Sequence, residues 1–408
     1  MKNCLVCDGP LTVFLDFGKQ PIANGFLKKD QFRTEYFFNM GAAFCQDCTM
    51  VQLLEQPDKT QMFHENYAFF SSSSDYMAQH FALFSDTVKE IVSAKTSPLV
   101  IEIGCNDGIF LKNFLGTHYR HLGIEPSQNV ANAAAERGLD VVTEFFDEAL
   151  ATKIIETRGF ADVIVSANVM CHIPYIDKVF LGIKSALAKD GVLVFEDPYV
   201  GDILQKCSFD QIYDEHTFLF STHSVGYLAK LHGLQLYDVE KQVTHGGSMR
   251  YFLCHDGQRK VSDRVKIQTE YEQRIGVNTL ETYVRFAQKV HEIGRKLKTL
   301  LAKLKSEGNC VVAYGATSKS TTVTNFFGIT DKDIDFICDT TPTKQFKYSP
   351  GAHIPVLPHD EFLNAKKHYV LLFAWNHAQE IMAKEKNHML QSNAKWIVYV
   401  PDVEIVEP

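Results

Sequence analysis

A glycine-containing segment in the first half of the chain has the residue types of a ligand-binding loop. Residues Glu102 to Gly108 read E-I-G-C-N-D-G and overlap the end of an apolar stretch that is typical of a buried strand. Glycine has no side chain, so Gly104 and Gly108 let the backbone approach a ligand closely. Roughly 20 residues further on, Glu125 ends the next apolar stretch, where an acidic side chain can accept both hydroxyls of a ribose. The pattern predicts a ligand that contains a nucleoside.

The glycine spacing bears on which nucleoside is bound. A dinucleotide loop reads G-x-G-x-x-G, whereas this loop reads E-x-G-x-x-x-G. That form resembles motif I of the class I methyltransferases, which bind S-adenosylmethionine. The resemblance implies that Glu125 binds the ribose, that the residues after the third strand flank the adenine, and that Asn168 lies near the methionine part. A strand and turn without a ligand is the alternative. The expected cofactor-binding residues are Glu102, Gly104, Asn106, Gly108, Glu125, Pro126, Phe145, Phe146 and Asn168.

Four of the ten cysteines form two closely spaced pairs, Cys4-x-x-Cys7 and Cys45-x-x-Cys48. Each pair can present two thiolates from a tight turn to one tetrahedral zinc ion. Four thiolates leave no open coordination position, so this zinc is expected to be structural and not catalytic. Unrelated thiol pairs or a redox-active Cys-x-x-Cys are the alternatives, and the doubled spacing favours zinc. We expect the residues between the pairs to fold as a small module of their own.

A second turn with ligand-binding residue types lies in the last third of the chain. Residues Gly315 to Thr321 read G-A-T-S-K-S-T after an apolar stretch. Backbone N–H groups, hydroxyls and Lys319 at the start of a helix form a ready site for a phosphate. Asp339 ends the next predicted strand, again at the ribose position. A nicotinamide site or a purely structural domain are the alternatives, and the lack of G-x-G-x-x-G counts against nicotinamide. Weaker candidates after later strands are Lys344 and Asn376.

Strands that alternate with helices must position both turns, and the loop after the first strand is expected to open a helix. This alternation predicts an α/β fold with a largely parallel, doubly wound sheet, in which ligands bind at the carboxyl ends of the strands. The predicted strands of the first sheet are Leu99–Ile103, His121–Ile124, Asp140–Thr143, Ala161–Ser166 and Gly191–Glu196, with helices at Ser127–Arg137 and Tyr175–Ala188. The predicted strands of a second, smaller α/β domain are Cys310–Tyr314, Ile334–Cys338, Tyr369–Ala374 and Trp396–Val400.

The composition of the 408-residue chain limits the classes of function. Hydrophobic residues make up 45% and charged residues 22%, as in folded globular proteins. The formal net charge is −8, which disfavours a nucleic-acid substrate because phosphate binding needs a surplus of Lys and Arg. No apolar run approaches a membrane span, and the first residues lack the apolar core of a signal peptide. We therefore expect a cytoplasmic protein, a monomer or weak oligomer, that binds neither membranes nor nucleic acid.

The order of these parts resembles a known family, the zinc-containing sugar C-methyltransferases. Its members act at C3 of nucleotide-linked 4-keto-deoxy sugars, as in the tetronitrose, mycarose and virenose pathways. The resemblance covers essentially the whole chain, and its most specific elements are Tyr213-Asp214-Glu215-His216 and His245-Gly246-Gly247-Ser248-Met249-Arg250. It implies methylation at C3 of a 4-keto-6-deoxy sugar linked to dTDP, with S-adenosylmethionine as donor and a structural zinc.

The resemblance also implies roles for individual side chains. Carbon is not nucleophilic until the proton next to the keto group is removed, so the enzyme needs a base and donors for the enolate oxygen. His216 is the expected base, because imidazole titrates near working pH, and Tyr213 is the alternative. Glu215 would orient His216 or hold its proton. The other residues expected to contact the sugar or diphosphate are His172, Tyr67, Ser248 and Arg250, together with Gly315, Lys319, Asp339, Lys344 and Asn376 of the second domain.

Alternatives remain for several of these residues and for the function. His172 could be a core histidine, Tyr67 could serve aromatic packing, and Arg250 could lie on the surface. A methyltransferase acting on oxygen or nitrogen, a nucleic-acid methyltransferase and a non-catalytic binding protein are the rival functions. The sugar, the nucleotide, the stereochemical outcome and the oligomeric state are left open. The expected domains are a zinc-binding module (1–66), a methyltransferase domain (67–257), a helical bridge (258–306) and a Rossmann-like nucleotide-sugar-binding domain (307–408).

Overall fold

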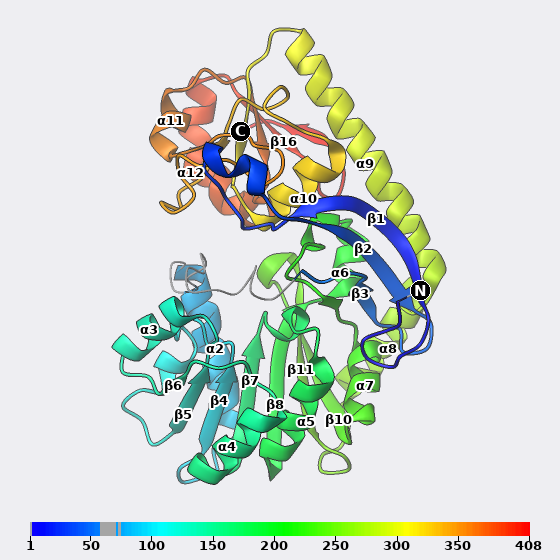
Figure 1. Cartoon of the computed structure of the whole chain (residues 1–408), viewed down its shortest axis with the longest axis vertical. Coiled ribbons are helices and arrows are strands. Elements are labelled where there is room, and N and C mark those ends of the chain that lie inside the picture. Colours follow the sequence, from blue (N-terminus) through cyan, green and yellow to red (C-terminus); the bar gives the residue numbers. More distant parts are fainter. Residues whose placement is uncertain (1, 58–70, 72–74) are drawn as a thin grey trace.

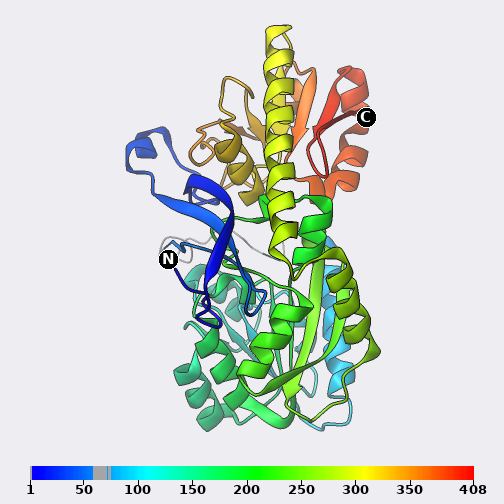
Figure 2. The same ribbon diagram turned by 90° about the vertical axis from the view of Figure 1, so that its right-hand side faces the viewer.

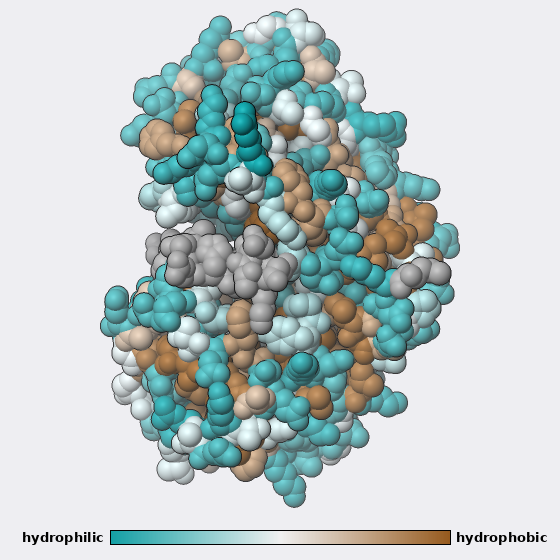
Figure 3. Space-filling model, in the orientation of Figure 1, coloured by the Kyte–Doolittle hydropathy of each residue, from teal (hydrophilic) through white to brown (hydrophobic). Residues whose placement is uncertain are grey.

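The computed structural model describes residues 2–57, 71 and 75–408, and these residues form three sheets. In Figure 1 the seven-stranded sheet lies in the lower half and the six-stranded sheet in the upper half. The four-stranded sheet runs along the side where the two halves meet (Figure 1). Figure 3 shows this face of the molecule, where hydrophobic residues occur in separate patches among hydrophilic ones, in keeping with the charge of −8.

The amino-terminal sheet is a long antiparallel hairpin with two short additions. Strand β1 (Leu11–Pro21) pairs with β2 (Phe37–Cys45), and β3 (Val51–Leu53) and β9 (Phe218–Leu219) extend the sheet. A short 3₁₀ helix, η1 (Lys29–Thr34), lies between β1 and β2. Apolar side chains of the hairpin share one core with the carboxy-terminal half. The hairpin between the cysteine pairs therefore packs against the carboxy-terminal half.

The middle sheet has the strand order β10-β11-β8-β7-β4-β5-β6. The strands from β4 to β8 are parallel, and β10 and β11 close one edge in antiparallel pairing. The strand order reverses between β4 and β7, so a crevice forms at their carboxyl ends. The strands are β4 (Leu99–Ile103), β5 (Arg120–Ile124), β6 (Val141–Val142), β7 (Ala161–Ala167), β8 (Leu187–Pro198), β10 (Leu234–Gln242) and β11 (Ser248–His255).

Both faces of this sheet are covered, which explains its nearly continuous apolar strands. On β4, Leu99, Ile101 and Ile103 enter one core and Val100 enters the other, as the two-residue period of a strand requires. The helices that contribute to the first core are α4 (Glu148–Arg158), α5 (Ile176–Ala186) and α7 (Thr222–Leu231), and those that contribute to the second are α2 (Asp75–Ile91), α3 (Gln128–Glu136) and η3 (Leu111–Phe114).

The loop after β4 differs from the sequence-based expectation, because no α-helix follows it. Turns lead from Gly104 into the 3₁₀ helix η3, and Gly116, at φ +69°, ends this segment. Only a few residues separate Gly108 from Gly116, and Phe110, Leu111 and Phe114 are buried against α2 and the sheet. A short 3₁₀ helix packed against the core thus replaces the expected α-helix.

The carboxy-terminal sheet has the order β14-β13-β12-β15-β16-β17, with all pairings parallel except the last. Its strands are β12 (Val311–Tyr314), β13 (Ile337–Cys338), β14 (Val356–Leu357), β15 (Tyr369–Leu372), β16 (Lys395–Val398) and β17 (Glu404–Val406). Its helices are α10 (Ser318–Phe327), α11 (His359–Asn364) and α12 (Ala378–Gln391), with the 3₁₀ helix η7 (Trp375–His377). The strand order reverses between β12 and β15, which places a second ligand crevice at their carboxyl ends.

Two helices connect the halves, α8 (Asp263–Ile275) and the long α9 (Leu280–Ser306). Figure 2 shows α9 running along the carboxy-terminal half beside the β1–β2 hairpin. The apolar side of α9 (Val290, Ile293, Leu297 and Leu301) packs into the core that this half shares with the hairpin. Among the described residues, no helix is long and apolar enough to cross a membrane. The remaining short helices are η4 (Met170–His172), α6 (Val200–Lys206), η5 (Phe209–Gln211) and η6 (Thr244–Gly246).

Candidate active site and zinc site

The four cysteines of the amino-terminal pairs converge on one point. The Sγ atoms of Cys4 and Cys48 are 3.5 Å apart and those of Cys7 and Cys45 are 3.4 Å apart. All four sulfur atoms lie within 4.8 Å of one another. A tetrahedral zinc ion with Zn–S bonds of about 2.3 Å fits between sulfur atoms at such distances. These residues form a structural zinc site that joins the first turn of the chain to the end of β2, and three of its cysteines pack into the core of the methyltransferase half.

A cavity of about 1150 Å³ lies between the two large sheets. Its lining includes the carboxyl ends of β4, β5, β7 and β8 from the middle sheet and the segments that follow β12 and β15 from the carboxy-terminal sheet. The two crevices that the strand orders predict are therefore two ends of one site. A third contribution comes from Asn24, which follows β1 of the hairpin.

The end of the cavity at β4 and β5 contains most of the expected cofactor-binding residues. Glu125 is buried, and its carboxylate accepts hydrogen bonds from the backbone N–H groups of Asn106 (3.1 Å) and Ser127 (2.8 Å). These bonds fix the carboxylate at the end of β5, where it borders the cavity and can accept ribose hydroxyls. The expected residues that line the cavity are Gly104, Asn106, Glu125, Pro126, Phe145, Phe146 and Asn168.

Glu102 and Gly108 do not line the cavity, contrary to the sequence-based expectation. Burial raises the pKa of Glu102 well above its ordinary value, and the neighbouring Glu125 and Asp107 add to this. Gly108 is at φ +80°, and a Cβ atom on it would lie 2.1 Å from the Leu139 side chain. Glu102 is buried in the protein interior, and Gly108 packs against α3 and the residues after it. Both residues therefore support the loop without facing the cavity.

Two histidines and a tyrosine form the centre of the cavity. The rings of His172 and His216 stack with centroids 5.3 Å apart, and the ring of Tyr213 lies 4.0 Å from that of His216. Burial lowers the pKa of His216 well below its ordinary value and that of His172 to about 3. Both imidazoles are therefore neutral at physiological pH, but burial makes each a weaker base than a free imidazole, so His216 does not titrate near working pH, contrary to the sequence-based expectation.

Glu215 lines the cavity but has a different partner from the one expected. Its Oε1 atom accepts a hydrogen bond from Asn24 Nδ2 at 3.0 Å, and burial raises the pKa of its carboxyl. His216 is oriented instead by the backbone carbonyl of Gln211, 2.6 Å from its Nδ1 atom. Glu215 thus connects the Tyr213–His216 segment to the hairpin, and the Gln211 carbonyl holds the His216 ring. Tyr67 lies outside the described residues.

The residues expected in the carboxy-terminal domain divide into two groups. Lys319, Lys344 and Asn376 line the cavity, and Lys344 Nζ donates to the backbone carbonyl of Ala316 at 2.8 Å. Asp339 does not reach the cavity, because its carboxylate accepts from the N–H groups of Ala316 (2.7 Å) and of Thr341 (2.8 Å). Gly315, at φ +96°, packs against Ala374 and likewise does not border the cavity.

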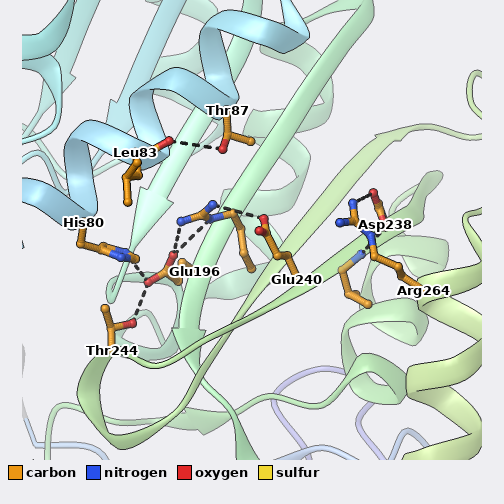
Figure 4. Close-up of polar contacts among 10 residues, drawn as sticks. His80, Leu83, Thr87, Glu196, Asp238, Glu240, Thr244 and Arg264 are labelled. Atoms are coloured by element: carbon orange, nitrogen blue, oxygen red, sulfur yellow. Dashed lines mark hydrogen bonds and ion pairs between the residues drawn. The ribbon is translucent and has the colours of Figure 1, made fainter.

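Ser248 and Arg250 lie outside the cavity, so the expected contacts to the sugar or diphosphate are not supported. Arg250 is 4% exposed, bonds to Glu196 through Nη2 at 2.9 Å and covers the Phe84 ring at 3.9 Å. Figure 4 shows this buried network around Glu196. Ser248 Oγ donates to the Thr244 carbonyl at 3.2 Å. Both side chains are used inside the fold, because β11 is paired on both sides, with β10 and β8, and nearly all of its residues are buried.

Several lining residues were not expected from the sequence. They come from the turn before β11, from α6 and from η7, and they are His245, Gly246, Lys206, Trp375 and His377. The two consecutive glycines after His245 indicated a turn, and a turn at a strand end is a usual place for ligand contacts. Asn24 gave no signal in the sequence, because only the tertiary fold brings the hairpin to Glu215.

The middle sheet, with an acidic residue at the end of β5 beside the glycine loop of β4, defines an S-adenosylmethionine-dependent methyltransferase. Family models match the chain in the same order, namely a putative zinc binding domain at residues 4–63, a methyltransferase domain at 76–239 and a C-methyltransferase C-terminal domain at 243–401. C-methyltransferase NovU from Streptomyces niveus is 30% identical over 410 residues, which cover 100% of this chain and 97% of NovU. The chain belongs to this family of C-methyltransferases, as the resemblance predicted.

Solved structures with similarity to this chain include magnesium protoporphyrin IX methyltransferase (ChlM) from Synechocystis PCC 6803. That structure is 13% identical, covers 45% of this chain and 82% of its own, and has a TM-score of 0.34. An S-adenosylmethionine-dependent methyltransferase from Clostridium acetobutylicum is 13% identical over 46% of this chain and 94% of its own, with a TM-score of 0.35. TM-scores this low support no conclusion about function.

Proposed function

We propose that this C-methyltransferase methylates C3 of a nucleotide-linked 4-keto-6-deoxy sugar. One observation carries the proposal, namely that His172 and His216 line the same cavity as the cofactor-side residues and Lys319. A substrate could place its sugar beside the histidines and its nucleotide at the carboxy-terminal sheet. The sugar would then lie next to the cofactor at the ends of β4 and β5, so all three parts of the cavity would be occupied. The 4-keto sugar and dTDP as the nucleotide follow from the family resemblance.

The chemistry assigned to the chain is proton removal and enolate stabilisation. S-adenosylmethionine supplies an electrophilic methyl group when it is bound. His216 takes the C3 proton through Nε2, because its Nδ1 atom is held by the Gln211 carbonyl. The C–H electron pair becomes the enolate, whose carbon forms the new bond to the methyl group while the bond from that methyl group to sulfur breaks and leaves its electron pair on the sulfur. Tyr213 is placed to donate to the enolate oxygen, since its ring lies beside that of His216.

Solvent exchange tests this proposal, because methyl transfer to oxygen or nitrogen requires no C–H cleavage. The enzyme is incubated in D₂O, without methyl donor, with a panel of dTDP-linked 4-keto-6-deoxy sugars, and the C3 proton is followed by NMR. Exchange at C3 with a substrate that is methylated once S-adenosylmethionine is added supports the proposal. Methylation of a panel member at oxygen or nitrogen, or no turnover of any member, contradicts it.

A further inference from the structure

The motif H-G-G-S-M-R brings His245 to the cavity, although its arginine and serine lie elsewhere. His245 occupies the 3₁₀ turn η6 with a left-handed backbone (φ 54°, ψ 21°) and lines the cavity. Its Nε2 atom is buried and has no hydrogen-bond partner among the residues that the structure describes. A histidine held in an uncommon backbone conformation, with a ring nitrogen left for another group, is a candidate ligand contact.

A buried network holds this turn from the side of the methyltransferase sheet. The Oε1 atom of Glu196 accepts a hydrogen bond from Thr244 Oγ1 at 2.9 Å and lies 2.8 Å from His80 Nε2, as Figure 4 shows. Arg250 binds the other carboxylate oxygen. Burial alone would raise the pKa of Glu196, but the bond to His80 and the Arg250 charge hold it below its ordinary value. Glu196 is therefore ionised, and its hydrogen bond to Thr244 fixes the residue that precedes His245.

The carboxy-terminal half contacts the same turn from the opposite side. A Cβ atom on Gly246 would lie 2.4 Å from Cη2 of Trp375, so the turn backbone rests against the indole. The Lys319 Nζ atom lies 5.9 Å from the centre of the same indole, and the indole N–H donates to Asp210 at 2.7 Å. His245, Lys319 and Trp375 thus line the same cavity, and the two basic residues come from different halves of the protein.

The charges around this turn favour an anionic ligand. Burial, and then the Lys319 charge, lower the pKa of His245 to about 4, and the same two causes lower the pKa of His377. Burial also lowers the pKa of Lys319, although Asp210 opposes this. A phosphoryl group between His245 and Lys319 would offset the electrostatic cost of Lys319 and would accept a hydrogen bond from the imidazole.

We infer that His245 contacts the sugar-proximal phosphoryl group of the substrate together with Lys319, and that Glu196 is a positioning residue that acts through Thr244. This inference rests on the proposed function, since it needs a substrate that carries a diphosphate next to the sugar. It explains why Arg250 and Ser248 lie beneath the cavity, because they support the Glu196–Thr244 contact from within the sheet. Neither half of the protein then binds the substrate alone.

Titration calorimetry of the full-length protein, saturated with S-adenosylhomocysteine, tests the inference with inorganic pyrophosphate and with dTDP as probes. We expect His245→Gln to raise the Kd of both probes by about tenfold or more, as loss of a hydrogen bond to a charged group predicts. His118→Gln is the matched control, because His118 is exposed and does not line the cavity. Thr244→Val should weaken both probes in the same direction, and Thr244→Ser, which keeps the hydroxyl, should restore their binding.

The outcomes separate this inference from the proposed function. Wild-type probe affinity in His245→Gln overturns the inference, and if Lys319→Met still loses affinity the proposed function stands. Failure of the wild-type protein to bind either probe overturns both. A Thr244→Val variant that loses S-adenosylhomocysteine affinity in parallel with probe affinity overturns the positioning role of Glu196, since general loosening of the fold would then explain the result.

Discussion

The Nδ1 atom of His216 lies 2.6 Å from the backbone carbonyl oxygen of Gln211. A carbonyl oxygen only accepts, so Nδ1 carries the proton and Nε2 is left as the acceptor. The carbonyl belongs to η5, which packs against α10 of the carboxy-terminal half, where Thr322 Oγ1 donates to the Ile212 carbonyl at 3.2 Å. The tautomer of the expected base is thus set by a segment that contacts both halves of the enzyme.

Replacement of His216 tests its role as the base. We expect His216→Asn to lower kcat by about 10²- to 10⁴-fold, the usual contribution of a general base. The Kd of S-adenosylmethionine should stay unchanged, because His216 is not at the cofactor end of the cavity. Tyr213→Phe should lower kcat less, since it removes an oxyanion donor and leaves the base. The measurement is methylated product by mass spectrometry beside cofactor titration, and normal turnover by His216→Asn would exclude this base.

The pH dependence of turnover follows from the burial of His216. Burial and the neighbouring His172 lower the pKa of His216 well below its ordinary value of about 6.5. The neutral imidazole is the active form, so kcat is retained as pH falls to about 6.5 and declines only below the depressed pKa. The profile of kcat with saturating substrate checks this, and an acid limb centred at pH 7 or above would contradict it.

Glu125 provides a test of the cofactor end. Glu125→Ala removes a buried carboxylate that is placed for the ribose hydroxyls, so we expect the Kd of S-adenosylmethionine to rise by about 10- to 100-fold, as for loss of a charged hydrogen-bond acceptor. Glu136→Ala serves as the control, because Glu136 is exposed at the end of α3. Calorimetric titration gives both values. Equal affinity in the two variants would show that Glu125 does not bind the ribose.

Loss of the zinc should lower the thermal stability of the protein. It should also lower turnover, because the hairpin that the zinc stabilises contacts the candidate active site. Cys45→Ser removes one of four thiolates at the end of β2, and we expect the bound zinc to be lost and Tm to fall by about 10 °C or more. Turnover should fall as well, because the hairpin contributes Asn24, which bonds to Glu215. Cys310→Ser, at a half-buried thiol outside the site, is the control. Metal content and melting curves check this, and unchanged zinc content in Cys45→Ser would contradict the four-thiolate site.

The local patterns of the sequence predicted the elements well where a strand is buried on both faces. The ranges expected at 99–103 and 161–166 agree with β4 and β7 to within one residue. The hairpin β1–β2 was not predicted, since its exposed and buried residues follow contacts with α9 and α10 that no local pattern reveals. The helix expected after Gly108 was wrong because the core favours a short 3₁₀ wrap.

In the candidate site, too, residues that follow buried strands could be predicted from the sequence, whereas those of the turn before β11 could not. Glu125, Asn168 and Lys319 line the cavity as expected because they follow strands, and the carboxyl ends of parallel strands meet at one edge. His245 lines the cavity although it was not predicted to, and Arg250, which was predicted, lies outside it, since the sequence does not show which members of a turn-and-strand motif point into the sheet. Arginine was preferred for its affinity for phosphate, but on the buried strand β11 its charge is matched by Glu196 of the neighbouring strand β8.

Arg250 and Arg264 provide a final test of this reassignment, because each pairs with a carboxylate at a different depth. Arg250 is buried on Glu196 and also pairs with Glu240, whereas Arg264 pairs with Asp238 at the surface, with 58% of its side chain exposed. Arg250→Met should lower the free energy of unfolding by about 3–5 kcal/mol, as for a broken buried pair. Arg264→Met should cost at most about 1 kcal/mol. Urea denaturation gives both values, and a fully stable Arg250→Met variant with impaired substrate binding would return Arg250 to the substrate site.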